Sequence, residues 1–222
     1  MEGKAYRILY IHGMGGGADS RIPAVLSSML PQSVPEGSAG AEITVRTYSF
    51  DPAEAAPVIS EWVRELSPDL VIGESLGAVH AIRIKGIPHI LVSPSLGAPR
   101  YLGLLGRLAV IPWVRNAASK AWRPKKGDRQ KLVFAPDLLR GYPSHGKAAL
   151  ANSPRMGSSD SFFAFFGRKD HYRKSGVVSL KTYRKYFGDT FQIYDGTHFM
   201  EEEFIRSMLV PKIWETLLGG KS

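Results

Sequence analysis

The feature of the sequence with the clearest chemical potential is a serine between two glycines. Ser75 is the centre of the pentapeptide GESLG, with an apolar run before it and a helical pattern over 76–85 after it. A serine in such a strand-to-helix turn takes a strained conformation, with its Oγ at the carboxyl end of the sheet. Amides at the helix start can stabilise an oxyanion there. The pattern favours a nucleophile, and the alternative is a turn that only allows close packing.

A serine hydroxyl becomes a good nucleophile when a base takes its proton. Of the six histidines, His198 is the preferred base, because it lies between the last predicted strand and the last predicted helix, at the same sheet edge as Ser75. His80, about one turn into the following helix, is expected to pack or cap, and His89 opens a strand at the far edge. His145 lies in a long insert, where it could contact substrate.

The base needs an acid that fixes its tautomer and stabilises the imidazolium. Asp170 follows the fifth predicted strand by three residues and is the preferred acid. Asp195 ends the last strand and is the second choice, because only three residues separate it from His198. Asp160 precedes the fifth strand, so we expect it at the opposite edge of the sheet.

Six short apolar runs predict the strands that must position these side chains: 6–11, 43–50, 69–73, 89–93, 162–167 and 190–195. Most are continuously apolar, which is typical of parallel strands covered on both faces. Helical patterns lie between them at 53–66, 76–85, 176–187 and 200–218, the last with a break at Pro211. Strands that alternate with helices predict an α/β fold with a doubly wound, mainly parallel sheet of about six strands.

The composition narrows the possible functions. The chain has 222 residues, of which 44% are hydrophobic, and this is enough for one sizeable core. It has no cysteine, which excludes disulfides, thiolate metal sites and a cysteine nucleophile. The N-terminus leads into a strand without a signal peptide, and no run approaches the ~18 apolar residues of a membrane span. We expect a single domain, 1–222, in the cytoplasm.

The positive charge is concentrated in one insert, 97–158, between the fourth and fifth predicted strands. The insert has twelve lysines and arginines and two acidic residues, whereas the rest of the chain has 17 basic and 18 acidic residues. A loop of this length without structure would be unusual, so we expect a small, partly helical lid. Its cations could guide an anionic substrate or contact an anionic membrane, or they could form a solvated face. We expect no nucleic-acid partner, because no recognised nucleic-acid-binding motif is present.

The chain order Ser75, Asp170, His198, each at the end of a successive strand, resembles the α/β-hydrolase superfamily. The segment YIHGMGG after the first strand is similar to that family's oxyanion segment, and the basic insert has the position of its lid. The tract GRKDHYRKSGVVSLKTYRKYFG resembles the small YqiA-type esterases. The resemblance implies a serine hydrolase without a cofactor or metal. It implies that the backbone amides of Met14 and Leu76 form the oxyanion hole.

Two other interpretations stay open. The dinucleotide-binding pattern G-x-G-x-x-A is matched by Gly13, Gly15 and Ala18. This pattern also requires an acidic residue at the end of the second strand, and no acidic residue lies there at the required distance. A protein with the same fold could also bind a small acyl ligand without cleaving it. For an enzyme, we expect an ester or thioester substrate, which the insert would contact through apolar residues such as Leu102, Leu105 and Trp113. The oligomeric state is not predicted.

Overall fold

The computed structural model describes residues 5–122 and 127–219. Its centre is one six-stranded sheet in the order β2-β1-β3-β4-β5-β6. All five strand pairs are parallel. The strands are β1 (Tyr6–Ile11), β2 (Ala41–Val45), β3 (Leu70–Glu74), β4 (His89–Val92), β5 (Phe162–Gly167) and β6 (Phe191–Tyr194). The expected doubly wound parallel sheet is therefore confirmed.

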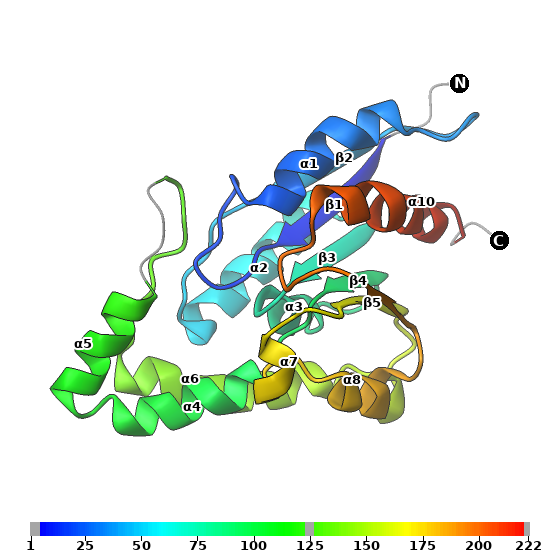
Figure 1. The fold of residues 1–222 in the computed structure, drawn as a ribbon. Helices are drawn as coiled ribbons and strands as arrows, with labels where there is room; N and C mark the ends of the chain where they lie inside the picture. Colours follow the sequence, from blue (N-terminus) through cyan, green and yellow to red (C-terminus); the bar gives the residue numbers. More distant parts are fainter. Residues whose placement is uncertain (1–4, 123–126, 220–222) are drawn as a thin grey trace.

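Helices cover both faces of the sheet, as Figure 1 shows. On one face lie α1 (Arg21–Met29), the short η1 (Leu30–Gln32) and α10 (Val210–Gly219). On the other lie α2 (Pro52–Leu66), α3 (Gly77–Ala81) and α8 (Leu180–Phe187). Neighbouring residues of one strand face opposite cores: Leu9 belongs to the core under α2 and α3, and Tyr10 to the core under α1 and α10. This arrangement explains why the strands read as continuous apolar runs.

The second strand is shorter than its apolar pattern predicts. The pattern extends from 43 to 50, whereas β2 ends at Val45. Tyr48 and Phe50 lie beyond the end of the strand and are buried in the core without strand partners. Asp51 then caps α2, because its side chain accepts a hydrogen bond from the Ala53 amide. Burial of a side chain thus produces an apolar pattern even where the backbone has no strand to pair with.

Two expected helices have a different form in the structure. The pattern over 176–187 corresponds to α8 alone, which Ser179 caps, while a separate turn α7 (Tyr172–Ser175) ends at Gly176 with a φ of 79°. The closing helical segment consists of α9 (Glu202–Phe204), the π-helical turn η3 (Ile205–Leu209) and α10. Pro211 does not interrupt this run. Because proline lacks an N–H, the wider π turn ahead of it accommodates the missing hydrogen bond.

The insert between β4 and β5 is largely helical. It contains α4 (Ala98–Leu108), α5 (Pro112–Ala121), α6 (Pro136–Leu150) and the short η2 (Pro154–Met156). Helix α6 anchors the insert, because Leu139 and Tyr142 are fully buried in the core beneath α2. Part of the basic stretch, at Arg123, Lys125 and Lys126, lies outside the described residues. Within 5–122 and 127–219, no helix has both the length and the apolar character needed to cross a bilayer.

Candidate active site

Ser75 lies in the sharp turn between β3 and α3 and has a positive φ of 51°. A non-glycine residue adopts this region rarely, and such strain is concentrated at functional sites. The turn is held from below, because the Ser75 amide donates to the Val92 carbonyl over 2.9 Å. A Cβ on Gly77 would collide with the backbone carbonyl oxygens of Ile11 and His12. The glycine after the serine therefore lets the helix begin directly against β1.

His198 lies in the loop after β6, and its Nε2 is 2.9 Å from the Ser75 Oγ. The histidine side chain is 3% exposed, so its hydrogen bonds are largely protected from water. The loop approaches β5 closely, since a Cβ on Gly167 would collide with the Thr197 carbonyl oxygen. The ring of Tyr172 packs edge-on against His198 with 4.7 Å between ring centroids. These contacts fix the position of the imidazole next to the serine.

Asp170 lies in the loop after β5, and its Oδ2 is 2.7 Å from Nδ1 of His198. Its Oδ1 accepts a hydrogen bond from the Tyr172 amide, which orients the carboxylate. The other two candidate acids lie elsewhere. Asp195 pairs with Lys169 over 3.0 Å, and Asp160 accepts hydrogen bonds from the Gly86 amide and the Asn152 side chain. The structure therefore brings Asp170, and neither alternative, into contact with His198.

The backbone amides of Met14 and Leu76 lie on the two segments that meet at the serine. A Cβ on Gly13 would lie 3.0 Å from the Ser75 Cβ, so the segment before Met14 lies directly against the serine side chain. Leu76 follows Ser75 and begins the turn into α3. Within the described part of the chain, neither amide donates a hydrogen bond to a protein acceptor. Both N–H groups are thus free to bind a ligand oxygen.

The structure adds Ser95 to the site. Its Oγ is 3.1 Å from the Ser75 Oγ, and the residue is 2% exposed. It follows β4, so it reaches the same sheet edge as the other three side chains, and its amide donates to the Ser75 carbonyl over 3.0 Å. The only signal in the sequence is the polar segment SPS, 93–95, which begins at the last residue of the predicted strand 89–93.

Glu74 is a second residue that the sequence analysis did not consider. It directly precedes Ser75, is 8% exposed and accepts a hydrogen bond from the Tyr10 hydroxyl over 2.8 Å. Burial raises the pKa of Glu74, an effect that the hydrogen bond from Tyr10 partly opposes. The carboxyl group therefore lies behind the serine turn in an environment that favours its neutral form.

The apolar residues expected to contact substrate are not all near one another. Leu102 and Leu105 on α4 are half-buried and pack against the core cluster that includes Leu76. Trp113 on α5 is 71% exposed and does not belong to that cluster.

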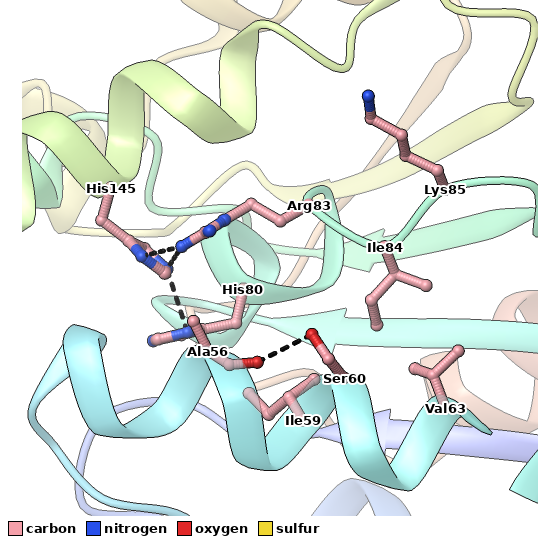
Figure 2. A pocket seen from close by; sticks show the side chains of 9 residues that line it. All are labelled: Ala56, Ile59, Ser60, Val63, His80, Arg83, Ile84, Lys85 and His145. Atoms are coloured by element: carbon pink, nitrogen blue, oxygen red, sulfur yellow. Dashed lines mark hydrogen bonds between the residues drawn. The ribbon is translucent and has the colours of Figure 1, made fainter. Parts of the chain in front are cut away.

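A pocket of about 240 Å³ lies between α2, the end of α3 and α6, away from Ser75 (Figure 2). It contains two of the sequence candidates: the Nε2 of His145 is 3.0 Å from Nδ1 of His80. Arg83 donates a hydrogen bond to Nδ1 of the same His145 ring. Burial lowers the pKa of both histidines, to about 4 for His145, and the nearby Arg83 adds to the effect. His80 and His145 thus form a polar cluster of their own behind α3.

Comparison with known proteins gives the same picture of the fold. No protein-family model matches the sequence, and no curated protein sequence matches it. Among solved structures, the monoacylglycerol lipase of Paleococcus ferrophilus superposes with a TM-score of 0.60 and 15% identity, over 96% of this chain and 94% of that one. Alpha/beta hydrolase domain-containing protein 10 from mouse gives a TM-score of 0.61 and 14% identity, over 100% and 93%.

A third structure, Est1E from Butyrivibrio proteoclasticus with ferulic acid bound, has a TM-score of 0.63 and 12% identity, over 97% of this chain and 90% of that one. The similarity to all three proteins covers nearly the whole length of each chain. It agrees with the six-stranded parallel sheet and the helices on both of its faces. The chain therefore has the α/β-hydrolase fold.

Proposed function

We propose that the protein is a serine hydrolase of the α/β-hydrolase superfamily that cleaves an ester or thioester bond. The observation that carries this proposal is the unbroken hydrogen-bonded path from Asp170 through His198 to Ser75, with distances of 2.7 and 2.9 Å. A nucleophile hydrogen-bonded to a base, and a base oriented by a third group, is the arrangement that activates a serine. A satisfied polar cluster would not require the strained backbone at Ser75.

In the proposed first step, the Ser75 Oγ attacks the substrate carbonyl carbon while its proton moves to Nε2 of His198. The carbonyl electron pair moves to the oxygen, which accepts hydrogen bonds from the Met14 and Leu76 amides. Asp170 accepts a hydrogen bond from Nδ1 and stabilises the imidazolium. His198 then returns the proton to the leaving alcohol or thiol as the carbonyl–heteroatom bond breaks, and Ser75 holds the acyl group.

The second half of the reaction needs only water. His198 takes a proton from a water molecule, whose oxygen attacks the acyl carbon of the ester on Ser75. The same two amides bind the second oxyanion, and the proton returns to the Ser75 Oγ as the carboxylic acid leaves. The same groups thus serve both half-reactions: Nε2 of His198 accepts and returns the proton, and the amides of Met14 and Leu76 bind the oxyanion.

The substrate proposal rests on the neighbouring structures and on a basic pocket. The superposed proteins include a monoacylglycerol lipase, whose name states that it acts on an ester, and Est1E with ferulic acid bound. A pocket of about 670 Å³ adjoins Asp170 and is lined by five cations: Arg168, Lys169, Arg173, Lys174 and Lys181. His171 also lines it, and its ring centroid is 6.4 Å from that of His198. The five cations support an anionic substrate. That the enzyme is of the YqiA type and that the insert 97–158 acts as its lid are parts of the proposal that rest on the resemblance in sequence alone.

Labelling with a fluorophosphonate tests the nucleophile directly. We expect the wild type to form a covalent adduct at Ser75, located by peptide mapping, and Ser75→Ala to form none. Ser95→Ala is the matched control, because it removes a hydroxyl only 3.1 Å away and should still label at Ser75. A folded wild type that is not labelled, but binds a fatty acid in the same site, would favour the non-catalytic acyl-binding interpretation instead.

A further inference from the structure

The exposed apolar side chains of the protein are concentrated in one part of the insert. Of the twelve large hydrophobic residues exposed in the described structure, six lie between 101 and 113: Tyr101, Leu104, Leu108, Val110, Ile111 and Trp113. Single exposed apolar residues are ordinary, but a contiguous group marks an interaction surface. Trp113, at 71% exposure, is the most exposed of the twelve.

The packing of α4 against α6 decides which of its residues face outward. A Cβ on Gly103 would collide with the ring of Pro143, and a Cβ on Gly106 would meet Leu139. The glycine side of α4 therefore fits closely against α6. The opposite side then consists of Arg100, Tyr101, Leu104, Arg107 and Leu108, all of them exposed and at helical spacing. The exposure of Leu104 and Leu108 follows from this packing, because a rotation of α4 that buried them would move Gly103 and Gly106 away from α6.

Helix α5 continues this surface with little packing of its own. Ala118 is its only buried residue, and Figure 1 shows the helix at the end of the insert that is farthest from the sheet. Arg115 and Lys120 are exposed on it. We define the α4–α5 face as the exposed residues Arg100, Tyr101, Leu104, Arg107, Leu108, Val110, Ile111, Trp113, Arg115 and Lys120.

The charge of the α4–α5 face has a single sign. The sequence from 75 to 127 contains no aspartate or glutamate. The four cations of the face make no ion pair with any residue in the described ranges. Exposed leucine and tryptophan side chains complement an apolar layer, and the unpaired arginines and lysines beside them complement anionic groups that cover such a layer.

We propose that the α4–α5 face docks the protein on the surface of an anionic lipid bilayer. In this arrangement Trp113 and the leucines enter the boundary between headgroups and acyl chains, and the cations contact the anionic headgroups. A second copy of the chain fits the face less well, because a two-fold contact would place the same four cations against one another. The protein then lies on the membrane surface, and among residues 5–122 and 127–219 no helix is both long and apolar enough to cross it.

The α4–α5 face is connected to the catalytic edge of the sheet. Helix α4 begins two residues after Leu96, which directly follows Ser95 of the candidate site. Within α4, the Tyr101 hydroxyl donates a hydrogen bond to the Ser175 carbonyl at the end of α7. The same turn carries Tyr172, which packs against His198. Docking would thus hold the candidate active site close to lipid. The proposal does not depend on hydrolysis, because binding can be measured with Ser75→Ala as well as with the wild type.

Cosedimentation with vesicles tests the proposal. The probes are vesicles of phosphatidylcholine alone and of phosphatidylcholine mixed with phosphatidylglycerol. We expect binding to the mixed vesicles, weaker binding at high salt, and little binding to phosphatidylcholine alone. Leu104→Ser with Trp113→Ser should lower the partition coefficient at least about tenfold. Each of Arg107→Gln and Arg115→Gln should lower it about fivefold.

Matched control variants distinguish binding through the α4–α5 face from nonspecific adsorption to the vesicles. Val34→Ser and Val58→Ser remove exposed apolar residues elsewhere, and Lys85→Gln removes an exposed cation outside the face. These three variants should bind like the wild type. Equal loss in the controls, or no binding to mixed vesicles, would overturn the proposal. A dimer in sedimentation equilibrium that Trp113→Ser dissociates would overturn it in favour of a contact between two copies.

Discussion

The hydroxyl oxygens of Ser95 and Ser75 lie 3.1 Å apart, so the candidate nucleophile has two hydrogen-bond partners, Ser95 and His198. A serine has one proton to donate. If Ser75 donates it to Nε2 of His198, then Ser95 is the donor in the contact between the serines. Ser95 would thereby select the rotamer in which the Ser75 hydroxyl points to the base.

We expect Ser95→Ala to lower kcat/KM for an ester by about tenfold, the effect of one neutral hydrogen bond. The loss should appear mainly in kcat, because the hydroxyl orients the nucleophile and is not placed to bind substrate. Steady-state kinetics of Ser95→Ala and Ser95→Thr measure this. An unchanged kcat in Ser95→Ala would show that His198 alone orients Ser75.

Exchanging the carboxylates for amides tests which acid orients the base. Asp170→Asn should lower kcat by about 10⁴-fold, because an amide can present its N–H to Nδ1 and select the wrong tautomer. Asp195→Asn is the matched control. It removes an exposed ion pair with Lys169, and we expect activity within about threefold of the wild type. A large loss in Asp195→Asn with an active Asp170→Asn would reverse the assignment.

The glycine after the serine has a steric role that a stability measurement can isolate. In Gly77→Ala the new methyl group would collide with the backbone carbonyls of Ile11, at the end of β1, and His12, directly after it. The backbone cannot rotate away as a side chain can. We expect a loss of about 1–3 kcal/mol in the free energy of unfolding. Gly40→Ala is the control, since a Cβ there meets nothing within 4 Å. Urea unfolding of both variants measures the difference, and equal stability would contradict the packing argument.

The His80–His145 cluster predicts a loss of stability in acid. The folded-state pKa of His145 is lowered to about 4, first by burial and then by Arg83, so the unfolded chain binds a proton more readily. Stability is therefore complete above the unfolded pKa of about 6.5 and decreases as the pH falls from there towards 4. The titratable or charged side chains that contact the His145 ring are His80, Arg83 and Tyr142.

His145→Gln should make the free energy of unfolding depend less on pH between about 6.5 and 4, because glutamine keeps hydrogen-bonding capacity and binds no proton. Urea unfolding at several pH values gives the slope. Ser144→Ala on the same helix is the control, because the Ser144 side chain is exposed and does not titrate in this range, and we expect it to leave the slope unchanged. A slope that is identical in His145→Gln and the wild type would exclude His145 as the source.

The sequence predicted the parts of the fold that depend on burial. Apolar runs identified the six strands, because most of them are covered on both faces, although in the edge strand β2 only Ala41 is buried. The sequence did not reveal where hydrogen-bonded pairing between strands ends. Tyr48 and Phe50 continue the apolar pattern because they are buried, although β2 has already ended at Val45. The split between α7 and α8 depends on the positive φ of Gly176, and a glycine alone does not reveal its conformation.

For the candidate site, position at the ends of parallel strands was enough to group Ser75, Asp170 and His198, because those ends meet at one edge. Ser95 lies at the same edge but has no motif, and its contact with Ser75 depends on the path of the loop after β4. The distribution of charge identified the insert. That the leucines and arginines of α4 share an exposed face becomes clear only from the packing of Gly103 and Gly106 against α6.

The order of the three candidate catalytic residues along the chain has a consequence for biosynthesis. Five strands precede Asp170, and all six precede His198. A nascent chain that emerges from its N-terminus can therefore present the Ser75 turn long before it possesses either the carboxylate or the imidazole. Under the proposed function, an incomplete chain therefore has an unactivated hydroxyl at Ser75 and does not attack esters. The onset of hydrolysis during refolding would accordingly report the moment at which β6 joins the sheet.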